Sequence, residues 1–172
     1  DITEALSSRR KEGIPQFLMG HSMGGGLVIK YILDGPERHN IAGLISSAPL
    51  LQTTPKAKSL TDDISLFALP IASKLMPNVT WNADINTKFI SRDPVEVKKY
   101  VEDPLIHSMG SLRTLGDMIS IGKLLMAKEC IDINIPIYIA HGSDDMITDP
   151  NASKLLIEKT KSKDKTFHEW DG

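Results

Sequence analysis

Apolar residues in the first 48 positions form two short continuous runs separated by a stretch at helical spacing. The runs over 15–19 and 41–46 predict buried strands, and the apolar positions over 27–33 predict a helix that ends at Gly35 and Pro36. A strand, a helix and a strand in this order predict a βαβ unit, in which the two strands are parallel.

Residues 49–132 show only helical patterns, with no strand signal between them. Asp93 before Pro94 predicts a helix start, because an aspartate caps the first N–H groups and proline fits the first helical position. Ser111 is a second candidate helix cap. An insertion of this kind between strands is a usual place for a lid over a binding site.

The strand and helix pattern resumes after residue 132. We expect a strand over 135–140, a polar loop over 141–148, a helix that begins at Asp149-Pro150 and a last strand over 165–170. The sequence therefore predicts an α/β fold with a mostly parallel sheet and flanking helices. Its parts are two core segments and a helical lid insertion, at residues 1–48, 133–172 and 49–132.

The charge balance argues against a nucleic-acid partner. With 20 Lys and Arg against 22 Asp and Glu among 172 residues, the formal net charge is −2, and no run of like charges provides a basic surface. Cys130 is the single cysteine, and no stretch approaches the roughly 20 apolar residues that span a bilayer. We therefore expect a soluble, cytoplasmic protein that contacts membranes or lipid droplets only peripherally.

The clearest candidate for catalysis is the sequence Gly20-His21-Ser22-Met23-Gly24, which matches the nucleophile-elbow pattern G-x-S-x-G. In such an elbow a strand turns sharply into a helix and the serine occupies the strained tip. We expect Gly20 and Gly24 to avoid collisions there. The N–H of Met23, in the first turn of the helix, is a candidate donor to a developing oxyanion.

Chance alone produces this pattern in about one chain in twenty of this length. Its position between a predicted strand and a predicted helix is the structural context that makes it specific. The other interpretation of a glycine-rich turn, a phosphate-binding loop, is disfavoured because neither G-x-G-x-x-G nor G-x-x-x-x-G-K-[ST] is present. The sequence therefore predicts a serine nucleophile at Ser22.

Four stretches of the chain together resemble the monoacylglycerol lipases of the α/β-hydrolase superfamily, in their fungal type. They are Gly20 to Gly25, Met76 to Arg92, Tyr100 to Leu105, and His141 to Asp145. The first and last of these stretches are common to many related hydrolases, whereas the part of the lid from Ser91-Arg92 to Asp103-Pro104-Leu105 is more specific to this family. The resemblance implies an α/β-hydrolase fold and a Ser, Asp, His triad in that chain order.

The acid of that triad is expected on the loop after the strand 135–140, where three aspartates lie. Asp149 precedes Pro150 and is best explained as a helix cap. Spacing alone does not decide between Asp144 and Asp145. The family pattern Gly-Ser-x-Asp selects Asp145.

No histidine of the chain fits the place that the resemblance gives to the catalytic base. His21 lies beside the nucleophile, where we expect it to pack or hydrogen-bond under the turn, and His141 precedes the acid, although the base should follow it. His168 falls inside the last predicted strand, whereas the family histidine follows that strand. We therefore expect the base beyond Gly172 and the second oxyanion donor before Asp1. On this interpretation the chain is the nucleophile-to-acid portion of a larger lipase and does not hydrolyse esters alone.

The apolar content of the predicted lid favours an apolar substrate. The resemblance narrows this to a monoacylglycerol, cleaved to glycerol and fatty acid through an acyl-serine intermediate without a metal or cofactor. The alternatives are a lysophospholipase or general carboxylesterase and, from another class, a hydrolase-fold protein that binds a ligand without turnover. The residues that either line an acyl pocket or pack the lid onto the core are Leu66, Phe67, Leu69, Ile71 and Met76.

Overall fold

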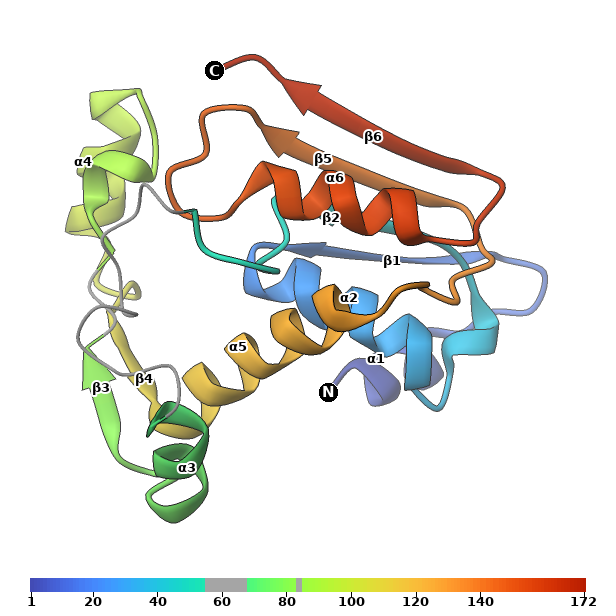
Figure 1. Cartoon of the computed structure of the whole chain (residues 1–172), viewed down its shortest axis with the longest axis horizontal. Helices are drawn as coiled ribbons and strands as arrows, with labels where there is room; N and C mark the ends of the chain where they lie inside the picture. Colours follow the sequence, from blue (N-terminus) through green and yellow to red (C-terminus); the bar gives the residue numbers. More distant parts are fainter. Residues whose placement is uncertain (55–67, 83–84) are drawn as a thin grey trace. The chain divides into compact units, whose positions relative to one another are not determined.

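The computed structural model describes residues 1–54, 68–82 and 85–172 (Figure 1). The chain divides into two compact units, a core unit of residues 1–54 and 121–172 and an insertion unit of residues 55–120. The insertion unit is narrower than the predicted lid. The reason is that Leu51, Leu125 and Ile131, inside the predicted lid, are buried in the apolar cluster of the core unit.

The core unit is built on a four-stranded parallel sheet in the order β1-β2-β5-β6. All four predicted strands are confirmed, and their carboxyl ends lie at one edge of the sheet. At that edge His21 pairs with Ser47, and Ser47 pairs with Ala140. The strand bounds are β1 (Gln16–His21), β2 (Ile41–Ser47), β5 (Ile137–Gly142) and β6 (Lys165–Trp170).

Two helices cover one face of this sheet. Helix α2 (Met23–Asp34) packs against β1 and β2, and α6 (Pro150–Lys159) packs against β5 and β6. Each helix connects neighbouring parallel strands in the same direction across the sheet, so right-handed crossovers place both on the same face. Figure 1 shows both helices alongside the sheet, and Ile29 of α2 and Leu156 of α6 belong to one buried cluster.

Two further helical segments of the core unit precede β1 and β2. Helix α1 (Ile2–Arg9) has a capping box formed by Asp1 and Glu4. It ends at Arg9, before the Gly13 that has a positive φ of 74° and turns the chain into β1. A short 3-10 helix, η1 (Arg38–Asn40), precedes β2.

Each of the three predicted helix caps makes the expected hydrogen bond. An Oδ1 atom accepts from the N–H two residues later at Asp93 (2.8 Å) and at Asp149 (2.9 Å). Ser111 Oγ accepts from the N–H of Thr114 at 3.1 Å. These caps begin α4 (Pro94–Glu102), α6 and α5 (Leu112–Ala127).

The insertion unit is not purely helical, so the expectation of no strand there is wrong. Strands β3 (Thr80–Asn82) and β4 (Met109–Ser111) form an antiparallel pair. Three-residue strands are too short to show an alternating pattern, and each pairs with a distant part of the chain. The other elements in the described part of this unit are α3 (Ala68–Leu75), η2 (Thr87–Phe89), α4 and the start of α5.

The described part of the insertion unit has a small apolar core of its own. Leu69, Leu112 and Leu115 are buried together there. Among the described helices of the whole chain, none combines the length and the apolar character that crossing a membrane requires.

Candidate active site

The turn from β1 into α2 holds Ser22 in a strained backbone conformation. Ser22 is the N-cap of α2, and its φ of 53° and ψ of −120° lie in a region that residues with a side chain rarely adopt. Its N–H donates to the carbonyl of Ser47 at 2.9 Å, and its carbonyl accepts from the N–H of Leu50 at 2.8 Å. Its side chain makes no helix-capping hydrogen bond. The backbone is therefore anchored on both sides while the hydroxyl is not used as a cap.

A side chain would collide with the backbone at only one of the two elbow glycines. A β-carbon at Gly20 would lie 2.2 Å from the carbonyl oxygen of Gly24, whereas one at Gly24 would meet nothing within 4 Å among the described residues. The expectation for Gly24 is therefore wrong. The close approach joins the α-carbon of Gly20 to the carbonyl of Gly24, so a side chain at position 24 points elsewhere.

The N-terminus of α2 packs closely against the chain that leaves β2. A β-carbon at Gly25 would lie 2.7 Å from Ser46 Oγ and 2.9 Å from Pro49 Cα. The first N–H groups of α2, including that of Met23, have no acceptor within the helix. They also lie at the positive end of the helix dipole, so this end of α2 favours an anionic oxygen.

His21 does not pack under the elbow. Its ring Nδ1 lies 3.2 Å from Ser47 Oγ, and the side chain is exposed. The expected hydrogen bond is therefore present without burial.

Four donors surround the carboxylate of Asp145, which lies on the loop after β5: three belong to that loop, and the fourth is His141 in β5. Oδ1 accepts from the N–H groups of Ile147 at 2.7 Å and Thr148 at 2.9 Å. Oδ2 accepts from the hydroxyl of Thr148 at 2.9 Å and lies 3.3 Å from His141 Nε2. Partial burial raises the pKa of this carboxyl, but the hydrogen bonds from His141, Thr148 and Ile147 together outweigh it and lower the pKa to about 2.

The structure gives the three aspartates of this loop different surroundings. Asp144 is exposed, and Asp149 Oδ1 accepts from the N–H of Asn151 as the cap of α6. Asp145 is the half-buried carboxylate with four donors. These surroundings therefore favour Asp145 over Asp144 as the candidate acid, without reference to any family pattern.

The segment 48–54 connects the elbow to this loop. The N–H of Leu50 donates to Ser22, that of Thr54 to the carbonyl of Ile147 at 3.1 Å, and that of Asp149 to the carbonyl of Gln52 at 3.0 Å. Residues 22 and 145, far apart in the sequence, are thus tied to one segment at the carboxyl edge of the sheet.

The sequence pattern does not single out three polar residues that surround Asp145. His141, Thr148 and Ser153 are all buried, and they form a hydrogen-bonded group with its carboxylate. One signal was available. His141 follows Ile137 and Ile139 at alternate positions of β5, so its ring belongs to the buried face of the sheet.

His168, the one histidine after Asp145, faces aromatic side chains. Its ring centroid lies 6.5 Å from that of Tyr138 and 4.2 Å from that of Trp170, and the side chain is exposed. The position of the catalytic base therefore stays a prediction.

The candidate acyl-pocket residues have different surroundings. Leu66 and Phe67 lie outside the described residues. Leu69 is buried against Leu112 and Leu115, which is the packing role. Ile71 and Met76 are 61% and 53% exposed. A lining role for any of them stays a prediction.

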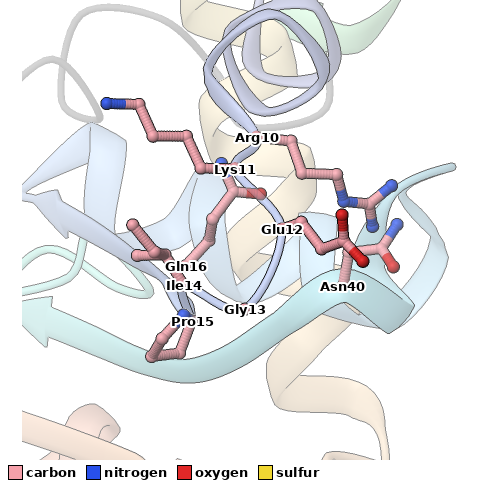
Figure 2. Close-up of a pocket in the computed structure, with 8 residues that line it drawn as sticks. All are labelled: Arg10, Lys11, Glu12, Gly13, Ile14, Pro15, Gln16 and Asn40. Atoms are coloured by element: carbon pink, nitrogen blue, oxygen red, sulfur yellow. The ribbon is translucent and has the colours of Figure 1, made fainter.

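A cavity of about 560 Å³ lies at the other end of the sheet, where β1 begins. Figure 2 shows its walls, which come from the loop between α1 and β1 together with Asn40 at the end of η1. None of the lining residues is a serine, cysteine or histidine, and Arg10 is paired with Glu37 at 3.7 Å. This cavity is therefore separate from the elbow and lacks the usual nucleophiles of acyl transfer.

The parallel sheet, the strained serine after β1 and the acidic loop after β5 define a protein of the α/β-hydrolase fold. The chain belongs to the family described as serine aminopeptidase, S33, whose model matches residues 1–172.

Several relatives of this chain are named as lipases. It is 31% identical over 178 residues to monoglyceride lipase of Saccharomyces cerevisiae, which covers 99% of this chain and 56% of that protein. A crystal structure of a soluble variant of the same lipase with a substrate analog superposes with a TM-score of 0.87 and 30% identity, over 99% of this chain and 57% of that one. Monoacylglycerol lipase of Paleococcus ferrophilus superposes with a TM-score of 0.85 and 30% identity, over 99% of this chain and 63% of that one. The chain spans about half the length of the curated relatives it matches.

Proposed function

We propose that the protein is a serine hydrolase that cleaves monoacylglycerols to glycerol and free fatty acid. The observation that carries this proposal is the conformation of Ser22, which sits at φ 53° on the N-cap of α2, beside N–H groups that have no helical acceptor. Strain of this kind persists where the surrounding structure enforces it, and it is common at active sites.

The reaction follows from that placement. Ser22 Oγ attacks the ester carbonyl carbon while a histidine base takes its proton, and the N–H of Met23 stabilises the resulting oxyanion. The bond to glycerol breaks, and the glycerol oxygen takes the proton from the base. Water, activated by the same base, then releases the fatty acid from Ser22. Asp145, already ionised at neutral pH, orients the base and stabilises its cationic form.

The glyceride substrate is supported by the names of the relatives, two of which are monoglyceride or monoacylglycerol lipases of known structure. The description of the family names a peptidase instead. Both chemistries begin with attack of a serine on a carbonyl, so the elbow alone does not distinguish them.

A substrate panel on the full-length protein tests this proposal. It contains a monoacylglycerol, a lysophospholipid, a short nitrophenyl ester and an aminoacyl arylamide. We expect the highest kcat/KM for the monoacylglycerol, and a fall of about 10⁴-fold or more in Ser22→Ala. A fluorophosphonate probe should label Ser22 and leave Ser22→Ala unlabelled. A higher kcat/KM for the arylamide would contradict the lipase, and absence of labelling would contradict any serine hydrolase.

We further propose a cytoplasmic protein that contacts a membrane or lipid droplet peripherally through its insertion unit. The support is a set of apolar side chains in that unit that are more than half exposed. Large exposed apolar side chains in one unit are typical of surfaces that meet lipid or another protein. They are Ile71, Leu75, Met76, Val95, Val101 and Leu105. Imaging of the tagged full-length protein, with and without substitution of Ile71 and Leu75 by serine, tests the location.

A further inference from the structure

The ring of His141 is fully buried and lies between two hydroxyl groups. Its side chain has no exposed surface. Nδ1 lies 2.8 Å from the hydroxyl oxygen of Ser153 in α6, and Nε2 lies 3.1 Å from the hydroxyl oxygen of Thr148. Nε2 also lies 3.3 Å from Asp145 Oδ2. The proposed reaction uses Asp145 but assigns nothing to these three neighbours.

The surrounding acceptors determine where the protons of this group lie. An ionised carboxylate only accepts hydrogen bonds, so the ring nitrogen that faces Asp145, Nε2, carries the proton. A neutral ring with its proton on Nε2 accepts a hydrogen bond at Nδ1, and the hydroxyl of Ser153 is placed to donate it. The hydroxyl of Thr148 accepts from Nε2–H and has one proton to give. That proton goes to Asp145 Oδ2 at 2.9 Å rather than to the carbonyl of Ala48 at 3.4 Å.

We propose that His141 is a positioning residue for the Asp145 carboxylate, held in one tautomer by Ser153 and acting both directly and through Thr148. This proposal rests on the proposed function, in which Asp145 is the acid of the triad. Oδ1 is fixed by two backbone N–H groups, and His141 and Thr148 fix Oδ2. The carboxylate therefore cannot rotate about its Cβ–Cγ bond without losing these hydrogen bonds.

The burial of the group supports this role. Polar side chains in an apolar interior are costly unless each is hydrogen-bonded, and a well-packed apolar residue avoids that cost. Here the ring and both hydroxyls are all but inaccessible to solvent, and every side-chain polar atom of the group has a partner. A satisfied polar group of this kind keeps its members in one geometry, which is what an acid that orients a base requires.

Two substitutions of His141 in the full-length protein test the contributions of the two ring nitrogens separately. His141→Gln keeps a donor that reaches the position of Nε2, whereas His141→Asn keeps a polar group only near Nδ1. We expect His141→Asn to lower kcat by about 10- to 100-fold with KM changed little, and His141→Gln to restore most of the loss. The matched control is Thr160→Val, which removes a buried hydroxyl that donates to Leu156 elsewhere in the core unit.

A measurement of the Asp145 carboxyl pKa by carbon-13 NMR provides a readout independent of turnover. We expect about 2 in the parent and in His141→Gln, and a value closer to 3.8 in His141→Asn. If His141→Asn does not fold, the test uses Ser153→Ala instead. This substitution changes little volume and leaves Nδ1 of His141 without its hydrogen-bond donor. For Ser153→Ala we expect a fall in kcat of about five-fold and a pKa shift in the same direction.

The outcomes distinguish this proposal from the proposed function. An unchanged Asp145 pKa and unchanged kcat in the folded His141 or Ser153 variant would overturn the positioning role. So would a loss of kcat that follows thermal stability in all variants, Thr160→Val included. If Asp145→Asn itself keeps full turnover, the role of Asp145 as the acid in the proposed function fails, while the NMR shift in the parent and the His141 variants still reports whether His141 holds the carboxylate.

Discussion

The carbonyl oxygen of Ser22 accepts a hydrogen bond from the N–H of Leu50 at 2.8 Å, across a gap of 28 residues in the sequence. This bond fixes one side of the turn at Ser22 to the chain after β2. The N–H of Ser22 donates to the carbonyl oxygen of Ser47 and fixes the other side. The same stretch of chain then reaches the acid loop, where Gln52 accepts from Asp149. The turn that carries Ser22 and the loop that carries Asp145 are thus both hydrogen-bonded to one backbone segment, residues 48–54.

A comparison of Gly20→Ala with Gly24→Ala tests the elbow geometry. The new β-carbon at position 20 would lie 2.2 Å from a backbone oxygen, so the turn must move, and we expect a loss of about 3 kcal/mol in the free energy of unfolding. Gly24→Ala meets nothing within 4 Å of the described chain and lies in the first turn of α2. There alanine is neutral or stabilises by up to about 1 kcal/mol. Urea unfolding measures both, and equal losses would contradict the geometry.

Single alanine substitutions of Asp144, Asp145 and Asp149 should separate three effects. Asp149→Ala removes the cap of α6 and should cost about 1 kcal/mol of stability with little change in kcat. Asp145→Ala should lower kcat by about 10⁴-fold, because the base loses its orienting acid. Asp144→Ala, at an exposed position, should change neither quantity. A large loss of kcat in Asp144→Ala would show that the acid lies one residue earlier.

The low pKa of Asp145 predicts a stability contribution that disappears in acid. Because its folded pKa of about 2 lies below the usual 3.8, ionised Asp145 stabilises the folded state above about pH 4. The shift corresponds to about 2 kcal/mol at neutral pH, and about half of that remains at pH 3. The difference in unfolding free energy between the parent and Asp145→Asn should shrink accordingly between pH 6 and pH 3. A difference independent of pH would contradict the hydrogen bonding of the carboxylate.

Local signals explain which elements the sequence predicts. The continuous apolar runs that became β1 and β2, and the Asp-Pro pairs before α4 and α6, act within a few residues, and all are found in the structure. Strands β3 and β4 were not predictable in this way, because Trp81 pairs with Gly110, and only a partner far along the chain makes so short a segment a strand.

The residues of the candidate site also differ in whether local signals predict them. Ser22 and Met23 follow from one contiguous motif, whereas the group around Asp145 requires strand alternation to bury His141 and helix α6 to bring Ser153 to its ring. Gly24 shows a further limit. The motif contains two glycines, but the collision depends on how the strand and the helix approach each other, and in the structure it involves the side-chain position of Gly20 alone.

The insertion unit offers a pair of substitutions that separates packing from lipid contact. Leu69 is 4% exposed and packs with Leu112 and Leu115, whereas Ile71, two residues later, is 61% exposed. Leu69→Ala should cost about 2 to 5 kcal/mol through the cavity it leaves. Ile71→Ser should leave stability within about 0.5 kcal/mol of the parent.

Ile71→Ser should instead reduce sedimentation of the full-length protein with phospholipid vesicles and lower activity on vesicle-borne monoacylglycerol. Its activity on a soluble nitrophenyl ester should be unchanged, because that substrate requires no surface binding. Thr114→Ser, at an exposed position of the same unit, is the control, because it removes only a methyl group. If Ile71→Ser binds vesicles as the parent does, Ile71 is not part of a lipid-contacting surface. The next residues to test for lipid contact are then the exposed apolar residues of α4 and of the loop after it.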